Sequence, residues 1–336
     1  LREGRLTGYG WSPRGDEVWM SVVSGATSEL RAFRPGGPER VLVALPGEFL
    51  LQDIARDGRV LAERLTERDE MIVAGPGRSP ERNLSWLDGS IPADISPDGS
   101  TVLFTESGAG SGGVDEVYLR RTDGSDAVRL GEGFALALSP DGKWALARRG
   151  ADTVLIPTGA GQSQPVSASG VTFDRGGTFS PDGAYLILSG TPPEGDSRLY
   201  EWSLESGAAR AVTPGGTVLE EGFHTVSPDG RAVVARDRDG KWAIYSLRSG
   251  SPSPVPIAVE GLESGDEPIR WTVEGRRLFV LAKSGSVFRL DPATGRRELY
   301  RETRPASVVH PTPDGAACVY GYGRHFSHLM LIEGIH

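Results

Sequence analysis

Ionisable side chains recur at one fixed position of this sequence, two residues before a repeated four-residue turn. The position holds two carboxylates, one guanidinium and one imidazole, namely Asp53, Asp94, Arg270 and His310. Carboxylate and imidazole groups transfer protons in acid–base catalysis, and all four can hold a polar ligand. We therefore predict these four as ligand-binding residues at the rim of a central channel. If the protein is an enzyme, Asp53, Asp94 and His310 are the candidate trio.

The alternative for these residues is structural. Buried polar groups need hydrogen-bond partners in any fold, and neighbouring N–H and C=O groups can satisfy all four side chains. A second candidate set is the aromatic and charged stretch near the C-terminus, for which the alternative is strand packing and solvent exposure: Tyr320, Tyr322, Arg324, His325 and Phe326.

The turn that defines these positions is Ser96-Pro97-Asp98-Gly99. Pro presets φ for the first corner, Asp can bond its own backbone, and Gly accepts the positive φ that closes the turn. Eight copies, some of them weaker, begin at residues 12, 55, 96, 139, 180, 227, 272 and 312, so the intervals are 40 to 47 residues. A period in the low forties over the whole chain indicates a repeat architecture.

Two consecutive apolar residues follow each turn, three and four positions after its glycine, as Val102 and Leu103 follow Gly99. Adjacent strand residues point to opposite faces, so these strands are predicted to be buried on both faces, as in a stack of sheets. Each unit has four short strands. In the unit of Gly99 they are the strand before the turn and residues 101–105, 116–120 and 127–130.

Four short antiparallel strands in a unit of about 42 residues describe one blade of a β-propeller. We predict an all-β protein, a propeller of seven to eight four-stranded antiparallel blades in one region over residues 1–336. The eighth unit lacks a fourth strand. Either residues 1–5 close the ring there, or further blades lie upstream of Leu1. Because the chain starts at Leu1 and not at Met, we expect it to be part of a longer one.

The composition excludes several kinds of partner. The formal net charge is −9 and no basic run is present, so nucleic acid is not an expected partner. No apolar run approaches the roughly 18 residues of a membrane span, so this segment itself is not expected to contact a membrane. The one cysteine, Cys318, cannot form an internal disulfide and lies in an apolar position, which favours a buried thiol over a nucleophile.

The sequence has no motif of known catalytic chemistry. It lacks the His-Arg-Asp and Asp-Phe-Gly motifs of kinases and the Gly-x-Ser-x-Gly motif of a nucleophile elbow. No two histidines have the i, i+4 spacing of a helical zinc site. We therefore predict no enzyme activity, no metal and no cofactor for this chain.

The repeat element resembles the TolB-like and WD-repeat-like propeller repeats of bacteria. Longer strings resemble the C-terminal propeller region of eukaryotic-like serine/threonine-protein kinases from acidobacteria, and they lie at residues 84–90, 93–99, 117–133, 135–147, 155–161, 265–271, 287–300 and 331–334. This resemblance covers nearly the whole chain. It implies a parent protein with a kinase domain, one membrane span and this propeller on the extracytoplasmic side.

Two classes of function follow. The first is a non-catalytic sensor or protein-interaction module of a membrane-anchored kinase, which binds a protein or a small molecule that the sequence does not identify. The second is a free-standing periplasmic propeller, either TolB-like in protein assembly or a propeller lyase or hydrolase.

Overall fold

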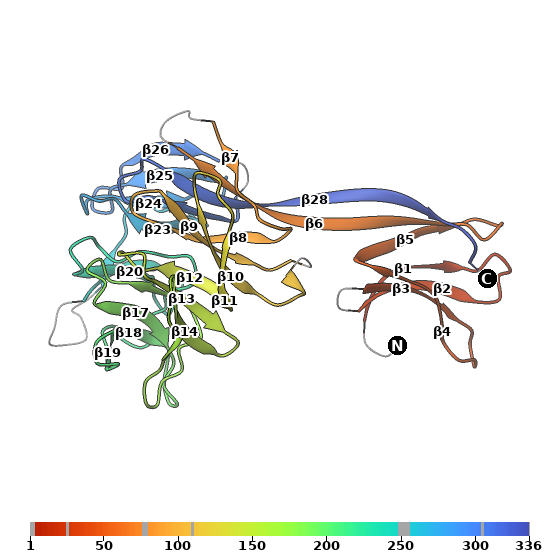
Figure 1. Cartoon of the computed structure of the whole chain (residues 1–336), viewed down its shortest axis with the longest axis horizontal. Coiled ribbons are helices and arrows are strands. Elements are labelled where there is room, and N and C mark those ends of the chain that lie inside the picture. Colours follow the sequence, from red (N-terminus) through yellow and green to blue (C-terminus); the bar gives the residue numbers. More distant parts are fainter. Residues whose placement is uncertain are drawn as a thin grey trace. The chain divides into compact units, whose positions relative to one another are not determined.

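The computed structural model describes residues 4–24, 27–75, 80–108, 111–247, 256–303 and 306–335 (Figure 1). The prediction of an all-β fold is confirmed, since these ranges contain β-strands and no α-helix. Within them, no helix is long and apolar enough to cross a membrane. The chain forms two compact units: unit 1 comprises Leu1–Arg68 and Gly323–His336, and unit 2 comprises Asp69–Tyr322.

Unit 1 contains a complete four-stranded antiparallel sheet. Five strands lie wholly in this unit, and the first four of them form the sheet in chain order: β1 (Arg5–Trp11), β2 (Val18–Ser24), β3 (Thr27–Phe33), β4 (Arg40–Pro46) and β5 (Glu48–Ile54). Two long strands, β6 (Val60–Ala74) and β28 (Cys318–Ile332), contribute residues to both units. These two strands are neighbours in one sheet, in which β6 pairs with β28 on one side and with β5 on the other.

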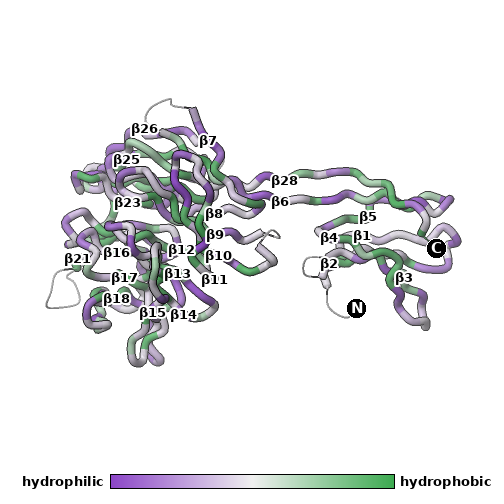
Figure 2. Tube along the Cα trace, in the orientation of Figure 1, coloured by the Kyte–Doolittle hydropathy of each residue, from purple (hydrophilic) through white to green (hydrophobic). Residues whose placement is uncertain are grey.

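Unit 2 contains six antiparallel sheets that follow one another along the chain. The first sheet consists of β8 (Ser90–Ile95), β9 (Thr101–Glu106), β10 (Glu116–Arg121) and β11 (Val128–Glu132). The second consists of β12 (Phe134–Leu138), β13 (Trp144–Arg149), β14 (Asp152–Pro157) and β15 (Gln164–Val166). The third consists of β16 (Gly177–Phe179), β17 (Tyr185–Gly190), β18 (Arg198–Ser203) and β19 (Ala209–Ala211). The fourth sheet has three strands, β20 (Ala232–Arg236), β21 (Trp242–Ser246) and β22 (Ile257–Ala258). The fifth consists of β23 (Glu267–Trp271), β24 (Leu278–Leu281), β25 (Ser286–Leu290) and β26 (Arg297–Glu302). Hydrophobic residues, drawn in green in Figure 2, lie along strands such as β12, as expected for strands that are buried on both faces.

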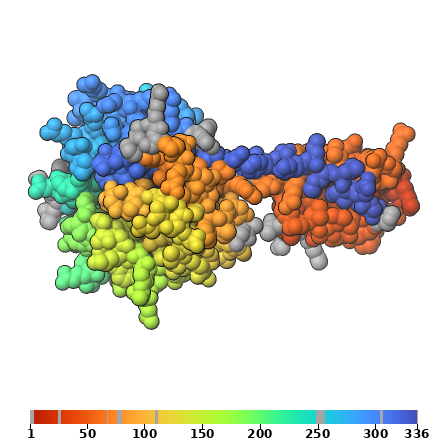
Figure 3. All heavy atoms as spheres, turned by 45° about the horizontal axis from the view of Figure 1, so that its top comes forward, coloured from red at the N-terminus to blue at the C-terminus, as the bar shows by residue number. Residues whose placement is uncertain are grey.

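The sixth sheet of unit 2 combines strands from distant parts of the sequence. Its order is β27 (Val308–Pro311), β28, β6 and then β7 (Arg82–Asn83). In Figure 3, orange atoms of the early strands and blue atoms of the late strands lie together in this unit. The repeat spacing predicts residues 71–74 and 82–86 as strands of the second blade. Residues 71–74 and 82–83 instead complete the blade of the eighth turn, where β6 pairs with both β28 and β7.

The innermost strands of the six sheets form a ring. β8 contacts β12, β12 contacts β16, β23 contacts β27, and β27 contacts β8. Between β16 and β23 the ring continues through residues 217–226, where His224 bonds Thr178 and forms a bridge with Arg270. Unit 2 is therefore a propeller with a closed ring of innermost segments. The predicted all-β propeller fold is confirmed, but the ring has six blades among the described residues, where seven to eight were predicted.

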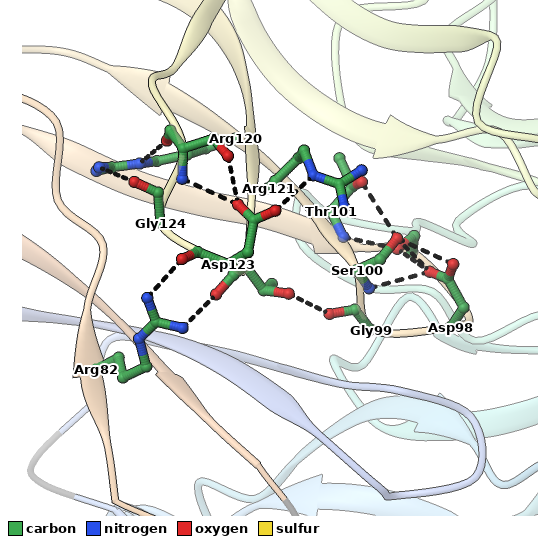
Figure 4. Close-up of polar contacts among 12 residues, drawn as sticks. Arg82, Asp98, Gly99, Ser100, Thr101, Arg120, Arg121, Asp123 and Gly124 are labelled. Atoms are coloured by element: carbon green, nitrogen blue, oxygen red, sulfur yellow. Dashed lines mark hydrogen bonds and ion pairs between the residues drawn. The ribbon is translucent and has the colours of Figure 1, made fainter.

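The repeat turns have the hydrogen bonds expected from their sequence (Figure 4). The Gly99 N–H donates to the Ser96 carbonyl at 2.8 Å, and the φ of Gly99 is +70°. One carboxylate oxygen of Asp98 accepts from the Ser96 hydroxyl at 2.6 Å and from the Ser100 N–H at 3.0 Å. These bonds lower the pKa of Asp98 below its ordinary value. Thr122 Oγ1 donates to the Gly99 carbonyl at 2.9 Å and fixes the turn to the next hairpin.

The predicted burial on both faces holds in unit 2 and not throughout unit 1. In unit 2, Val102 and Leu103 are both 0% exposed. In unit 1, Leu61 occupies the position of Val102 and is 36% exposed. Trp11 and Trp271 also share one repeat position, and they are 66% and 6% exposed. A blade position is buried only where a second blade covers it.

The domain organisation differs from the predicted single region over residues 1–336. Six of the eight repeat turns, from residue 96 to residue 312, lie in unit 2, and the turns at 12 and 55 lie in unit 1. Arg5 does not close the ring of unit 2, because it pairs with Val23 in unit 1. Residues 1–3 of the predicted closing segment lie outside the described ranges.

Candidate functional site

Three of the four predicted site residues meet at the centre of unit 2. Asp94 lies on β8, Arg270 on β23 and His310 on β27, and they are 4%, 8% and 1% exposed. The Arg270 guanidinium donates to the Asp94 carboxylate through Nη2 and to the Pro311 carbonyl through Nη1, the latter at 3.1 Å. The ring of innermost strands therefore brings a buried ion pair and an imidazole together from three blades.

The fourth predicted residue, Asp53, is not part of this cluster. It lies on β5 in unit 1, and its side chain accepts a hydrogen bond from the N–H of Ile54 at 2.8 Å. The residue is exposed to solvent. Its repeat position matches that of Asp94, but position within a repeat does not decide to which unit the repeat belongs.

The Asp94 carboxylate has its acceptor sites occupied. Oδ2 accepts from the N–H of Leu138 at 2.9 Å, while Oδ1 accepts from the N–H of Ile95 at 2.8 Å and from Arg270. His224 Nε2 lies 3.7 Å from the same Oδ1. Burial alone raises the pKa of Asp94, but the positive charge of Arg270 and the bond from the Leu138 N–H outweigh burial, so the pKa lies below its ordinary value.

His224 belongs to the cluster and was not among the predicted residues. Its Nδ1 lies 3.1 Å from Thr178 Oγ1, and its Nε2 lies 2.9 Å from the Ala93 carbonyl. Only one signal in the sequence points to it. The interval between the turns at 180 and 227 is the longest of the seven intervals, at 47 residues. The extra residues form a bulge between two bridges, Val218↔Arg236 and Val226↔Val233, and this bulge carries His224 into the ring.

Both imidazoles of the cluster are neutral at ordinary pH. Burial lowers the pKa of His224. Burial, with the nearby His224, lowers the pKa of His310 to about 3. The two rings are neighbours, with centroids 5.3 Å apart. A protonated pair at this distance inside the protein would repel, so the cluster contains one ion pair and two neutral rings.

A pocket of about 240 Å³ lies over this cluster, at the end of the innermost strands where the repeat turns begin. The second residue of every repeat turn in unit 2 contributes to its lining: Pro97, Pro140, Pro181, Pro228, Val273 and Pro313. We call it the proline-rimmed pocket. Phe179 and Trp271 extend the apolar wall, while Asp94, His224 and Arg270 form the polar part.

The polar side chains of the cluster are bonded to one another and to the protein backbone. Asp94, His224 and Arg270 each have hydrogen-bond partners within the protein, so none of them presents a free base or acid to the pocket. Within the described ranges, no group of three or more His, Cys, Asp or Glu could hold a metal ion. What the proline-rimmed pocket offers a ligand is mainly an apolar rim over a fixed, buried ion pair.

A larger hollow, of about 410 Å³, lies in unit 1. Its charged lining is partly paired, since Arg34 bonds Asp16 and Arg40 bonds Glu17 at 2.9 Å. Arg14, Arg56 and Asp57 also line it.

The second candidate set is divided between the two units. Tyr320 and Tyr322 pack in the core of unit 2 together with Cys318, whereas Arg324 lies over the ring of Phe326 in unit 1. The alternative of strand packing therefore accounts for the two tyrosines. Cys318 is 0% exposed, as predicted for a buried thiol.

Comparison with known proteins gives a few partial matches. No family model matches the chain. A curated protein named lipoprotein LpqB, from Streptomyces avermitilis, is 28% identical over 206 residues, which is 54% of this chain and 32% of that protein. The chain thus spans about a third of the length of the curated relative it matches.

Among solved structures, the chain is similar to TolB from Acinetobacter baumannii, with a TM-score of 0.45 at 14% identity over 88% of this chain and 76% of that one. It is also similar to hydrazine synthase from Kuenenia stuttgartiensis, with a TM-score of 0.48 at 14% identity over 99% of this chain and 97% of that one. A puromycin hydrolase gives a TM-score of 0.44 at 19% identity over 92% and 56%. None of these proteins is named as a kinase, so the predicted kinase connection stays a prediction.

Proposed function

We propose that this chain is a non-catalytic binding module in which the proline-rimmed pocket of unit 2 holds an apolar side chain of a protein ligand. One observation carries the proposal. Each of the six repeat turns of unit 2 contributes its second residue to one pocket, and the rim that results is apolar. A ring built in this way offers a concave, largely apolar surface, which is where binding sites are typically found.

The chemistry of the pocket supports binding over catalysis. The Asp94 carboxylate is held by Arg270 and by two backbone N–H groups, so it cannot take a proton from a ligand without losing these bonds. Asp53, the third member of the predicted catalytic trio, lies in unit 1. The lyase or hydrolase alternative has no observation in its favour here.

We propose an extracytoplasmic location for the module. The support is the curated relative, which is named as a lipoprotein. A free-standing envelope propeller and the sensor region of a membrane-anchored kinase both agree with this location. The kinase role rests on the sequence resemblance alone.

The experiment is a selection of phage-displayed random peptides on the purified chain. We expect enriched peptides to share an apolar or aromatic residue, and their binding to be lost in Val273→Asp, which places a charge on the exposed rim. Val273 is 53% exposed, and Val128→Asp is the matched control, because Val128 is 58% exposed on β11, away from the pocket. Failure to enrich any peptide, or equal binding to the Val273→Asp protein, would overturn the proposal.

A further inference from the structure

A second pocket of unit 2, of about 210 Å³, lies at the other ends of the innermost strands. Its lining includes Glu267, the first residue of β23, and Val308, the first residue of β27. The proline-rimmed pocket, in contrast, is lined by the turns that follow these strands. The two pockets share no lining residue, so a ligand of one does not occupy the other.

Three carboxylates line this second pocket, which we call the acidic pocket. Glu220 and Glu221 lie on the bulge of the fourth blade, and Glu267 lies beside them on β23. Two guanidinium groups compensate part of the charge: Arg148 bonds Glu221, and Arg236 Nη2 lies 3.4 Å from a Glu267 oxygen. Among the residues that the structure describes, Glu220 forms no ion pair, so the pocket has surplus negative charge.

The direction of the pKa shift of Glu267 agrees with this surplus of negative charge. Burial raises the pKa of Glu267, Arg236 lowers it, and the neighbouring Glu220 raises it, so the pKa lies above its ordinary value. A cation placed between Glu220 and Glu267 would relieve this repulsion.

His310 adds an unused hydrogen-bond acceptor to the lining. Its Nε2 lies 3.2 Å from the Pro92 carbonyl, which can only accept, so Nε2 carries the proton of the neutral ring. Nδ1 is then a bare acceptor. It is buried and has no hydrogen-bond partner among the described residues, although His310 is 1% exposed and lines the acidic pocket. A buried acceptor without a donor is destabilising, and a ligand N–H that bonds to it restores the missing hydrogen bond.

Apart from Ser307, the rest of the lining is apolar. Phe223, Ile269 and Val309 line the pocket together with the three carboxylates and His310. The combination fits a ligand with an aliphatic stem and a positively charged end that donates several N–H bonds. A primary ammonium has three donors and no acceptor.

We propose that the acidic pocket binds the aliphatic ammonium group of a lysine side chain on a partner protein. The stem packs between the apolar residues, and the ammonium donates to His310 Nδ1 and to the carboxylates of Glu220 and Glu267. This site is separate from the proline-rimmed pocket, so it stands or fails independently of the proposed function.

The test uses the whole chain and the probe Nα-acetyl-lysine N-methylamide, with Nα-acetyl-norleucine N-methylamide as the uncharged comparator. Long-range ¹H–¹⁵N spectra of the histidine rings report whether Nδ1 of His310 accepts a hydrogen bond. We expect the lysine probe to shift this resonance in a saturable way, and the norleucine probe to leave it unchanged. Raising the salt concentration should weaken binding, because the pocket is open to solvent and its charges are screened.

The double variant Glu220→Gln with Glu267→Gln removes both negative charges. It should weaken binding of the lysine probe on the order of tenfold, because two partly exposed charge interactions are lost. Glu298→Gln is the matched control, because Glu298 pairs with Arg277 on the surface, outside the pocket lining. Val273→Asp should also leave lysine binding unchanged. Equal binding of the two probes, an unmoved His310 resonance, or full affinity in the double variant would each overturn the proposal.

Discussion

The guanidinium of Arg270 bonds the carboxylate of Asp94 at the centre of unit 2, although the two residues are 176 positions apart in the sequence. Their side chains are 10% and 6% exposed. The pair connects the first and the fifth blade of the ring, so its integrity depends on ring closure.

Removing one partner of this pair should destabilise the protein strongly. Asp94→Asn leaves Arg270 charged and buried, and we expect a loss of about 3–5 kcal/mol in the free energy of unfolding. Urea denaturation measures it. The control Glu298→Gln breaks a pair whose side chains are 43% and 56% exposed and should change stability by less than about 1 kcal/mol. Similar losses in the two variants would show that the central pair is not buried in solution.

Stability should fall as the pH is lowered from about 6.5, because of the buried histidines. Burial lowers the pKa of His310 from its ordinary 6.5 to about 3, so between these values the unfolded chain binds a proton that the folded chain does not. Stability rises with pH in this window by about 1.4 kcal/mol per pH unit for each such histidine. Urea unfolding between pH 4.5 and 6.5 measures the slope.

The control for this prediction is His310→Gln. It should reduce the slope of stability against pH by about 1.4 kcal/mol per pH unit, which is the contribution of one proton. The depressed pKa of Asp94 acts in the same direction, but only as the pH falls below its unfolded value of about 3.8. An unchanged slope in the variant would mean that His310 is protonated in the folded state.

Two tryptophans at one repeat position should differ in their contribution to stability. Trp271 is 6% exposed and donates to the Thr225 carbonyl at 2.8 Å, whereas Trp11 is 66% exposed. We expect Trp271→Ala to cost about 3–5 kcal/mol and Trp11→Ala less than about 0.5 kcal/mol, both measured by urea denaturation. A large cost for Trp11→Ala would contradict the exposure of this face of unit 1.

Cys318 should resist thiol reagents in the folded protein. Burial raises the pKa of this thiol to about 11, and the residue is 0% exposed in the core of unit 2. Because the thiolate is the reactive form, we expect dithionitrobenzoate at pH 8 to react only as fast as unit 2 opens, and at once in urea. Rapid reaction without denaturant would place Cys318 at the surface.

The local structure of the repeats could be predicted from the amino-acid sequence alone. The eight turns were identifiable because proline, aspartate and glycine act on their own backbone, and every turn glycine has a φ between +67° and +92°. Strands buried on both faces followed from consecutive apolar residues such as Val102 and Leu103. The polar position before each turn was also visible, and the structure brings three of its residues together, Asp94, Arg270 and His310, while their predicted role in ligand binding stays a prediction.

The pairing of strands from distant segments could not be predicted from the sequence and is seen only in the folded chain. The division into two units, the use of residues 71–74 and 82–83 to complete the last blade, and the separation of Asp53 from Asp94 all depend on pairing between distant segments. His224 enters the ring through a bulge whose shape the repeat pattern does not encode. Pairing energy comes from backbone bonds common to all strands, so similar repeats compete for the same partners, and packing of the complete chain selects among them.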